Sequence, residues 1–280
     1  MNKLSIEKQT LILKSLCEGN SIRSIERISN THRDTIMRLL VFAGNKAQEI
    51  MDERLQNLNC TYIQCDEIWT FVGKKRSRLR GKEKNPLEIG DQWIFVALDP
   101  DTKLVPAFHV GKRTAINTNY FKSLLKAKVS NRFQLSTDSF HCYPNAVENN
   151  FATNIDYAQL DKIYREEYKG ERRYSPPKIV RLNKKFIQGY PDLKKVSTSH
   201  VERQNLTMRM QMRRFTRLTN AFSKKLDNLE AACSLHFFYN NFMRIHQTLR
   251  VTPAMEANVS NHIWSWKEFL LSYTIYQKAA

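Results

Sequence analysis

Three acidic residues in different local settings constrain the fold of this chain most strongly. Asp66 lies in TYIQCDEIWTFV and Asp138 in FQLSTDSFHCY, which are β-branched and aromatic runs that predict strands. Glu202 begins a long stretch without Gly or Pro, which predicts a helix. Mg²⁺ prefers oxygen ligands and usually takes only a few carboxylates, leaving positions for water and phosphate. Two strand carboxylates and one helix carboxylate therefore suit a fold that gathers them around two divalent metal ions and a phosphodiester.

The charge balance of the chain indicates a polyanionic partner. Lys and Arg outnumber Asp and Glu by 45 to 27, so the formal net charge is +18. So large an excess favours nucleic acid as the partner over the alternative of a merely soluble basic protein. The 280 residues, 41% of them hydrophobic, suffice for one large domain with small appendages.

The cysteines and the lengths of the apolar runs indicate the cellular compartment of the protein. No apolar run approaches the roughly 20 residues that cross a bilayer, and the first residues lack a signal peptide pattern. We therefore expect no membrane association and a cytoplasmic protein. The cysteines form no CxxC pair and are odd in number, so neither a disulfide framework nor a zinc site is predicted. They are Cys17, Cys60, Cys65, Cys142 and Cys233.

Residues 1–44 predict a small helix-turn-helix domain. Three short helical patterns occupy residues 4–43, and a tight turn joins the last two. Any three-helix bundle would show this periodicity, but arginines on the polar surfaces favour DNA binding. In this motif the last helix enters the major groove with its N-terminal residues leading. The charged, helix-prone residues 45–59 predict a linker. The candidate DNA contacts are Arg23, Arg27, Thr31, His32 and Arg33.

The middle of the chain predicts an α/β domain. Strands are expected at 92–99 and 103–110, a helix from Thr114 or Asn117 to about Val129, then the Asp138 strand and another strand at 156–163. A basic stretch with few regular signals, 164–195, precedes the helix of Glu202. This order is that of the ribonuclease H-like fold, a mixed sheet flanked by helices. That fold carries carboxylates on its first strand, its fourth strand and a later helix, and the three acids occupy those places.

With these residues assembled, the chain resembles the DDE transposases of the insertion-sequence-one family over roughly residues 60–258. The resemblance is carried by QCDEIWTFVGKK, STDSFHCYPNAV, HVERQNLTMRMQMRRFTRLTNAFSKK and FFYNNFMRIHQTLRVTPAMEA. It implies a nuclease that binds the terminal inverted repeats of an insertion sequence, cuts the ends and joins them to target DNA. It also implies a prokaryotic, nucleoid-associated protein. Many relatives carry a cysteine-rich zinc finger ahead of the helix-turn-helix, and this chain does not.

The resemblance assigns the catalytic and metal-binding roles to Asp66, Asp138 and Glu202, with two Mg²⁺ or Mn²⁺ ions. The residues themselves leave alternatives open. Glu67 neighbours Asp66, and strand alternation puts the two on opposite faces without deciding which face holds metal. Asp138 could only cap a turn, and Glu202 could be a first-turn carboxylate favoured by the helix dipole.

Basic residues near these acids are candidate DNA contacts. Asn205 and Arg209 share the helix face of Glu202, and family members often carry a basic residue at the spacing of Arg209, which predicts a phosphate contact. The alternative is a solvated basic face. The candidates outside residues 1–44 are Lys74, Lys75, Arg76, Arg78, Arg203, Asn205, Arg209, Arg213 and Arg214.

The end of the chain predicts an apolar helix in residues 259–280 that either completes the core or meets a second subunit. A transposase acts on two DNA ends, so at least a homodimer is expected on double-stranded DNA, with Phe237–Phe242 and Trp264–Tyr276 as candidate contact surface. Two rival functions remain open. One is a ribonuclease H-like nuclease or resolvase without strand transfer, and the other is a non-catalytic transposase-derived DNA-binding regulator.

Overall fold

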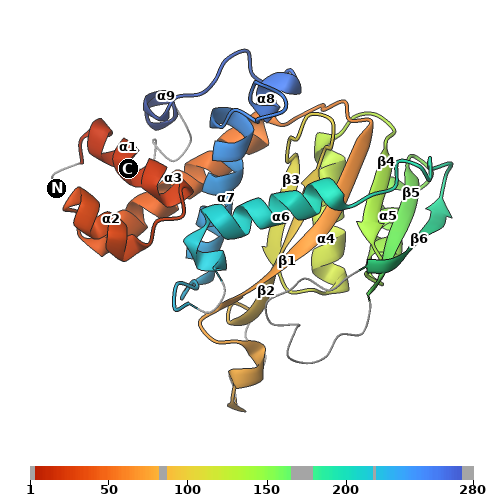
Figure 1. Cartoon of the computed structure of the whole chain (residues 1–280), viewed down its shortest axis with the longest axis horizontal. Helices are drawn as coiled ribbons and strands as arrows, with labels where there is room; N and C mark the ends of the chain where they lie inside the picture. The colour runs from red at the N-terminus through yellow and green to blue at the C-terminus, as the bar shows by residue number, and fades with distance from the viewer. Residues whose placement is uncertain (1–3, 82–86, 165–178, 217–218, 273–280) are drawn as a thin grey trace.

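A six-stranded mixed sheet forms the centre of the molecule (Figure 1), in the strand order β3-β2-β1-β4-β5-β6. The computed structural model describes residues 4–81, 87–164, 179–216 and 219–272. β1–β2, β2–β3 and β5–β6 pair antiparallel, whereas β4 pairs parallel with both β1 and β5. The strands are β1 (Tyr62–Val72), β2 (Gly90–Leu98), β3 (Ala107–Gly111), β4 (Gln134–Asp138), β5 (Asp156–Tyr164) and β6 (Ile179–Gln188).

Helices cover both faces of this sheet. α4 (Ala115–Lys128) and α5 (Tyr143–Phe151) lie on one face, and α6 (Ser199–Gln211) and α7 (Leu226–Phe238) on the other (Figure 1). Strand alternation supplies apolar side chains to both layers: Phe95 of β2 contacts a phenyl ring of α4, and Phe108 of β3 contacts one of α7. The predicted mixed α/β sheet with flanking helices and an N-terminal helical region is confirmed.

The basic stretch at 164–195 contains a strand that the sequence did not predict. β6 pairs with β5 at the edge of the sheet, and nearly all of its residues are exposed. A strand exposed on both faces has no reason to alternate polar and apolar residues, so its period-2 signal is absent. Residues 165–178 of this stretch lie outside the described residues.

The N-terminal helices are α1 (Ile6–Cys17), α2 (Ile22–Ser29) and α3 (Arg33–Arg54). The hydroxyls of Ser5 and Ser21 accept hydrogen bonds from backbone N–H groups in the first turns of α1 and α2. Asn30 ends α2 in the left-handed conformation, which turns the chain sharply into α3. α3 continues across residue 44 to Arg54, so the predicted third helix and residues 45–54 of the predicted linker form one helix without a break.

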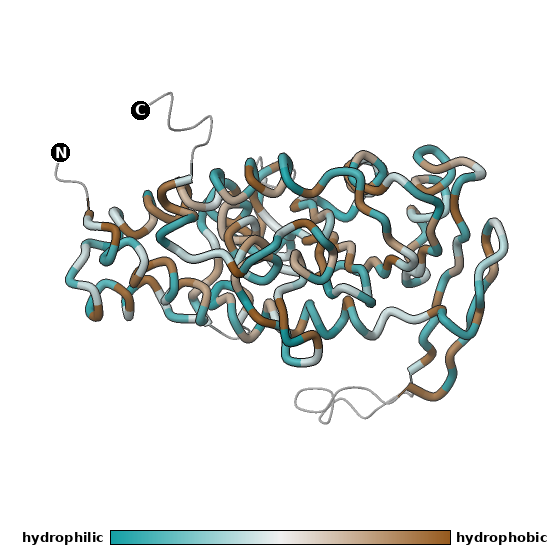
Figure 2. The backbone as a smooth tube through the Cα atoms, turned by 90° about the horizontal axis from the view of Figure 1, so that it is seen from above, coloured by the Kyte–Doolittle hydropathy of each residue, from teal (hydrophilic) through white to brown (hydrophobic). Residues whose placement is uncertain are grey.

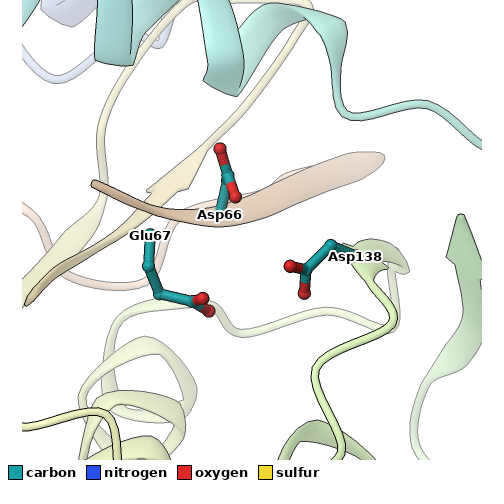
Figure 3. A group of neighbouring side chains, drawn as sticks. All are labelled: Asp66, Glu67 and Asp138. Atoms are coloured by element: carbon teal, nitrogen blue, oxygen red, sulfur yellow. The ribbon is translucent and has the colours of Figure 1, made fainter. Parts of the chain in front are cut away.

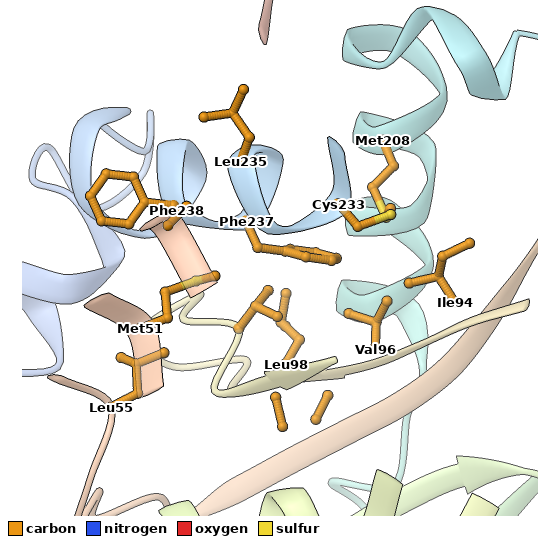
Figure 4. Close-up of a cluster of buried hydrophobic side chains, with 14 of the residues drawn as sticks. Met51, Leu55, Ile94, Val96, Leu98, Met208, Cys233, Leu235, Phe237 and Phe238 are labelled. Atoms are coloured by element: carbon orange, nitrogen blue, oxygen red, sulfur yellow. The ribbon is translucent and has the colours of Figure 1, made fainter. Parts of the chain in front are cut away.

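A glycine sets the distance between α3 and α7. A Cβ on Gly44 would lie 2.3 Å from the carbonyl oxygen and 2.5 Å from the Cβ of Ala231 in α7. Glycine inside a helix costs roughly 1 kcal/mol relative to alanine, so its place here is explained by this close approach. Figure 4 shows the apolar cluster beside the crossing, where Met51 and Leu55 of α3 meet β2, α6 and α7.

The described aromatic residues near the C-terminus pack in the core of their own chain, which is the first of the two alternatives that the sequence left open. Phe237, Phe238, Phe242 and Phe269 are 0% exposed, and they belong to one apolar cluster with α1, α3 and the sheet. The helix expected in 259–280 is short, α9 (Trp266–Leu271), and residues 273–280 lie outside the described residues.

The remaining short elements connect these layers. They are η1 (Arg76–Arg78), η4 (Arg213–Phe215), the π-helical turn η5 (Tyr239–Met243) and α8 (Pro253–Glu256). The molecule is elongated, with α1 and α2 at one end and β5 and β6 at the other, and polar and apolar segments alternate along the backbone (Figures 1 and 2). No described helix is long and apolar enough to cross a membrane.

Candidate functional site

Asp66, Asp138 and Glu202 meet at one open cavity of about 590 Å³. Asp66 lies in the middle of β1, and Asp138 is the last residue of β4, the parallel neighbour of β1. Glu202 stands in the first turn of α6, which crosses the same face of the sheet (Figure 1). The parallel pairing and the crossing helix therefore bring together three residues that are far apart in sequence.

Asp66 points to the α6 face of the sheet. It pairs with Val96, whose side chain lies in the apolar cluster beneath α6 and α7 (Figure 4). Asn205 is buried and donates a 2.9 Å hydrogen bond from Nδ2 to Asp66 Oδ2. Burial and the nearby Asp138 and Glu202 charges raise the pKa of Asp66 to about 6. Asn205, predicted as a DNA contact, is thus hydrogen-bonded to this carboxylate.

Glu67 leaves β1 on the opposite face, as the strand period requires. Its Oε2 accepts a 3.1 Å hydrogen bond from Arg113 Nε, and the side chain is buried. Burial, followed by the Asp138 charge, raises the pKa of Glu67 to about 7. One carboxylate oxygen each from Asp66, Glu67 and Asp138 nevertheless lie within 4.8 Å of one another (Figure 3). Glu67 thus belongs to the carboxylate cluster, so the alternative that Glu67 and not Asp66 is the metal ligand stays open.

The sequence allowed Asp138 either to cap a turn or to take part in the site, and the structure shows it capping the turn and lining the cavity. Its Oδ1 accepts a 3.0 Å hydrogen bond from the backbone N–H of Phe140, the turn-capping contact. Its Oδ2 lies 3.5 Å from Arg113 Nη2 and faces the cavity. The cap fixes the carboxylate at the end of β4, so one side chain both ends the strand and faces the site.

Glu202 stands slightly apart from the tight carboxylate group. Its Oε1 accepts a 2.6 Å hydrogen bond from Thr198 Oγ1 and forms an ion pair with Lys162 Nζ. Lys162 comes from β5 and Glu202 from α6, and both line the cavity. The first-turn position that the helix dipole favours is therefore also a position on the wall of the site.

Two cations beside the carboxylates shape the electrostatics of the site. Lys162 lies in the strand expected at 156–163 and was not singled out as a site residue, and neither was Arg113. Arg113 also lies over the ring of Phe140, 3.9 Å from its centroid, so its guanidinium is held between two carboxylates and an aromatic face. Its only sequence signal was its place just before Thr114, the cap of α4.

The carboxylate cluster fits a hard divalent cation. The donor atoms are carboxylate oxygens from β1 and β4, and burial, followed by the charge of Asp138, raises the pKa values of Asp66 and Glu67. Mg²⁺ and Mn²⁺ prefer such oxygen donors. Among the described residues, Asp66, Glu67 and Asp138 bring one oxygen each close enough to share an ion, and Glu202 lines the same cavity farther away.

The raised pKa values predict that the free energy of unfolding of the metal-free protein falls as the pH rises. Because the folded values of Asp66 and Glu67 exceed the unfolded ones, the folded state binds more protons between about pH 4 and 7, and stability falls as pH rises through that window. We expect Asp66→Asn/Glu67→Gln to gain on the order of 2 kcal/mol over wild type near pH 8 in EDTA, and little near pH 4. Thermal unfolding at both pH values measures it, and a gain independent of pH would contradict the assignment.

The candidate DNA contacts of the N-terminal helices differ in exposure. Arg23, Arg27 and Arg33 are exposed. His32 is exposed and caps α3, where its Nδ1 accepts from the backbone N–H of Asp34 at 3.3 Å. Thr31 is an exception, because it is 6% exposed and its hydroxyl donates to Ser29 O at 3.2 Å. Its side chain is used within the turn and does not reach a partner at the surface.

The later candidates also divide into surface and interior groups. Arg214 donates from Nη1 to Ser223 Oγ at 2.7 Å and to Asn228 O at 2.8 Å, so it ties η4 to the start of α7. Arg209 lies on α6 two turns beyond Glu202 and is partly buried. The exposed members of the set are Lys74, Lys75, Arg76, Arg78, Arg203 and Arg213.

Comparisons with known proteins give loose structural likenesses. No protein-family model matches the chain, and no curated protein does. Among solved structures it is similar to piggyBac transposase in a synaptic complex with hairpin DNA, with 12% identity and a TM-score of 0.41 over 95% of this chain and 68% of that one. It is also similar to Mos1 transposase in a paired-end complex with the left transposon end, with 11% identity and a TM-score of 0.21 over 56% of this chain and 59% of that one.

Proposed function

We propose that this protein is a DNA transposase of the DDE type, which cuts the ends of a mobile element and joins the freed 3′ hydroxyl to target DNA. One observation carries the proposal: Asp66, Asp138 and Glu202, separated by more than sixty residues at each step, line the same open cavity. Their elements are a first strand, its parallel neighbour and a later helix. That arrangement is the one expected from the sequence resemblance.

The protein's own residues would position the substrate and the ligands. Asn205 orients Asp66 through its amide, and the turn after β4 orients Asp138. Bound Mg²⁺ or Mn²⁺ would supply charge stabilisation at the attacking and leaving oxygens of the phosphodiester. Exposed lysines and arginines around the cavity and along η1 would hold the phosphate backbone. Catalysis of this kind consists mostly of positioning and charge neutralisation.

The decisive experiment is a strand-transfer assay. Purified protein is incubated with end-labelled candidate element ends, a target plasmid and Mg²⁺, and denaturing gels resolve cleaved from joined products. The proposal predicts both products. Cleaved ends without joined ends would assign a nuclease or resolvase, and bound but intact DNA would assign a regulator. Sizing the complex formed with two ends tests the expected dimer, because one active site per chain requires two chains for two ends.

End recognition is expected to depend on exposed arginines of the N-terminal helices. Deleting residues 1–43 would remove part of the common core, so point variants are the cleaner test. We expect Arg27→Ala/Arg33→Ala to lose on the order of tenfold in preference for element ends over random DNA, because one proposed contact from α2 and one from the start of α3 are removed. Weak, salt-sensitive binding by the rest of the basic chain should remain.

Competition binding with labelled ends measures this preference. Lys126→Ala/Arg250→Ala is a matched control, since it removes two exposed positive charges from other parts of the surface. If both double variants lost the same amount of preference, the effect would be one of net charge, and the recognition role of α2 and α3 would be refuted.

A further inference from the structure

A second cavity, of about 480 Å³, lies where the N-terminal helices meet the catalytic domain. It shares no lining residue with the carboxylate cavity. Its walls come from the α1–α2 turn, from η4 and the segment after it, and from α7. The apolar part of the wall consists of Leu16, Ile22, Leu40, Met212, Phe222 and Leu235.

The walls of this cavity are fixed against each other by close contacts. Gly19 has φ +75° in the α1–α2 turn, and a Cβ there would lie 2.9 Å from the carbonyl oxygen of Met210 at the end of α6. Tyr239 OH donates a 2.9 Å hydrogen bond to Glu18 Oε1 in the same turn. The turn therefore docks on the end of α6, and the cavity is a preformed feature of that junction.

The cavity carries concentrated and uncompensated positive charge. Three guanidinium groups line it, those of Arg23, Arg213 and Arg214, and no Asp or Glu is among its lining residues. Within the described part of the chain, none of the three lies within 4 Å of a carboxylate oxygen. Arg214 has only the neutral acceptors Ser223 Oγ and Asn228 O, and burial lowers its pKa to about 10. Cations gathered without counter-charge in a partly enclosed space favour binding of an anion.

A buried polar group in the same wall also lacks a partner. His236 is 2% exposed, and its Nε2 accepts a 2.8 Å hydrogen bond from Asn240 Nδ2. Burial lowers the pKa of this imidazole to about 3, so it is neutral and carries its proton on Nδ1. That Nδ1 is buried and has no hydrogen-bond partner among the described residues. Buried donors are nearly always paired in folded proteins, so this one marks a place where an acceptor is missing.

We propose that this cavity binds a nucleotide unit, with its phosphate on Arg23 and Arg213 and its base against the apolar wall. Arginine recognises phosphate by paired hydrogen bonds, and a cavity of several hundred Å³ with apolar walls and a few polar groups suits such a ligand. The unit is either a free nucleotide or an unpaired nucleotide of DNA, which share this chemistry. The site is separate from the carboxylate chemistry and does not depend on it.

Binding is tested by titration calorimetry in EDTA at physiological salt, so that metal-bound nucleotide at the carboxylates does not contribute. The probes are inorganic phosphate, AMP, ATP and a ten-nucleotide single strand. The variants are Arg23→Gln and Arg213→Gln, both at exposed positions, and Arg250→Gln is the matched control. Their unliganded melting temperatures verify that each variant folds.

Saturable one-to-one binding of AMP or ATP is expected, weakened on the order of tenfold by Arg23→Gln or Arg213→Gln and unchanged by Arg250→Gln. If only the single strand shows this arginine dependence, the nucleotide unit comes from DNA and the site stands. Two results overturn the proposal. One is that no probe depends on Arg23 or Arg213 more than on Arg250. The other is that inorganic phosphate binds as tightly as AMP, which would leave the apolar wall without a role.

Discussion

Protein carrying Asp66→Asn, Asp138→Asn or Glu202→Gln is expected to lose DNA cleavage and joining while it still binds DNA. Each change keeps the size of the side chain and removes one of the charges proposed to bind metal at the cavity. Metal ions at such sites contribute several kcal/mol of transition-state stabilisation, so a loss of roughly a thousandfold or more in rate is expected. Single-turnover assays with labelled ends and Mg²⁺ measure the rate, and gel shifts measure the retained binding.

Glu67→Gln separates the two assignments of the carboxylate cluster. Glu67 lies on the face of β1 opposite to Asp66 and is held by Arg113. We therefore expect a rate loss well below that of Asp66→Asn. Near-normal strand transfer by Asp66→Asn together with inactivity of Glu67→Gln would assign the catalytic role to Glu67 and remove it from Asp66. Full activity of Asp66→Asn, Asp138→Asn or Glu202→Gln would remove that residue from the proposed catalytic set.

Gly44→Ala is expected to destabilise the fold by about 3 kcal/mol. In an ordinary exposed helix position the same change is stabilising by roughly 1 kcal/mol, so here the expected sign is reversed. The new methyl group would overlap the backbone and Cβ of Ala231, at 2.3 to 2.5 Å, and α3 and α7 would have to move apart. Urea unfolding followed by circular dichroism measures the free energy of unfolding.

The control for this prediction is Glu53→Ala, an exposed position on the same helix. It should stay within about 0.5 kcal/mol of wild type, because the side chain is exposed to solvent. Equal or greater stability of Gly44→Ala would show that the two helices are not held at the distance that the glycine allows.

Local patterns predicted the elements that carry the site because each pattern has a local cause. Alternation along β1 separated Asp66 from Glu67, and the hydroxyl of Thr114 marked the start of α4 correctly. Which strand lies beside β1 is decided by long-range packing, so the approach of Asp138 to both acids could not be read from periodicity. The same holds for Arg113, which follows β3 and meets Glu67 and Asp138 only once β2 and β4 lie on either side of β1.

Side-chain burial was the other property that sequence could not supply. Thr31 and Asn205 are polar residues in segments expected at the surface, yet both are buried and hydrogen-bonded inside the molecule. The aromatic residues near the C-terminus were compatible with a core or with an interface. Only the path of the chain back across α3 decides between them, and it places them in the core.

The unbroken course of α3 has a geometric consequence for any DNA held by the protein. Its 22 residues extend roughly 33 Å from the turn after α2 into the core beside the sheet. A helix clamped along its second half against α7 does not swing like a tethered arm. The length of the helix would therefore set the number of base pairs between a bound recognition sequence and the cut phosphodiester. Inserted base pairs would move the scissile bond past the carboxylates.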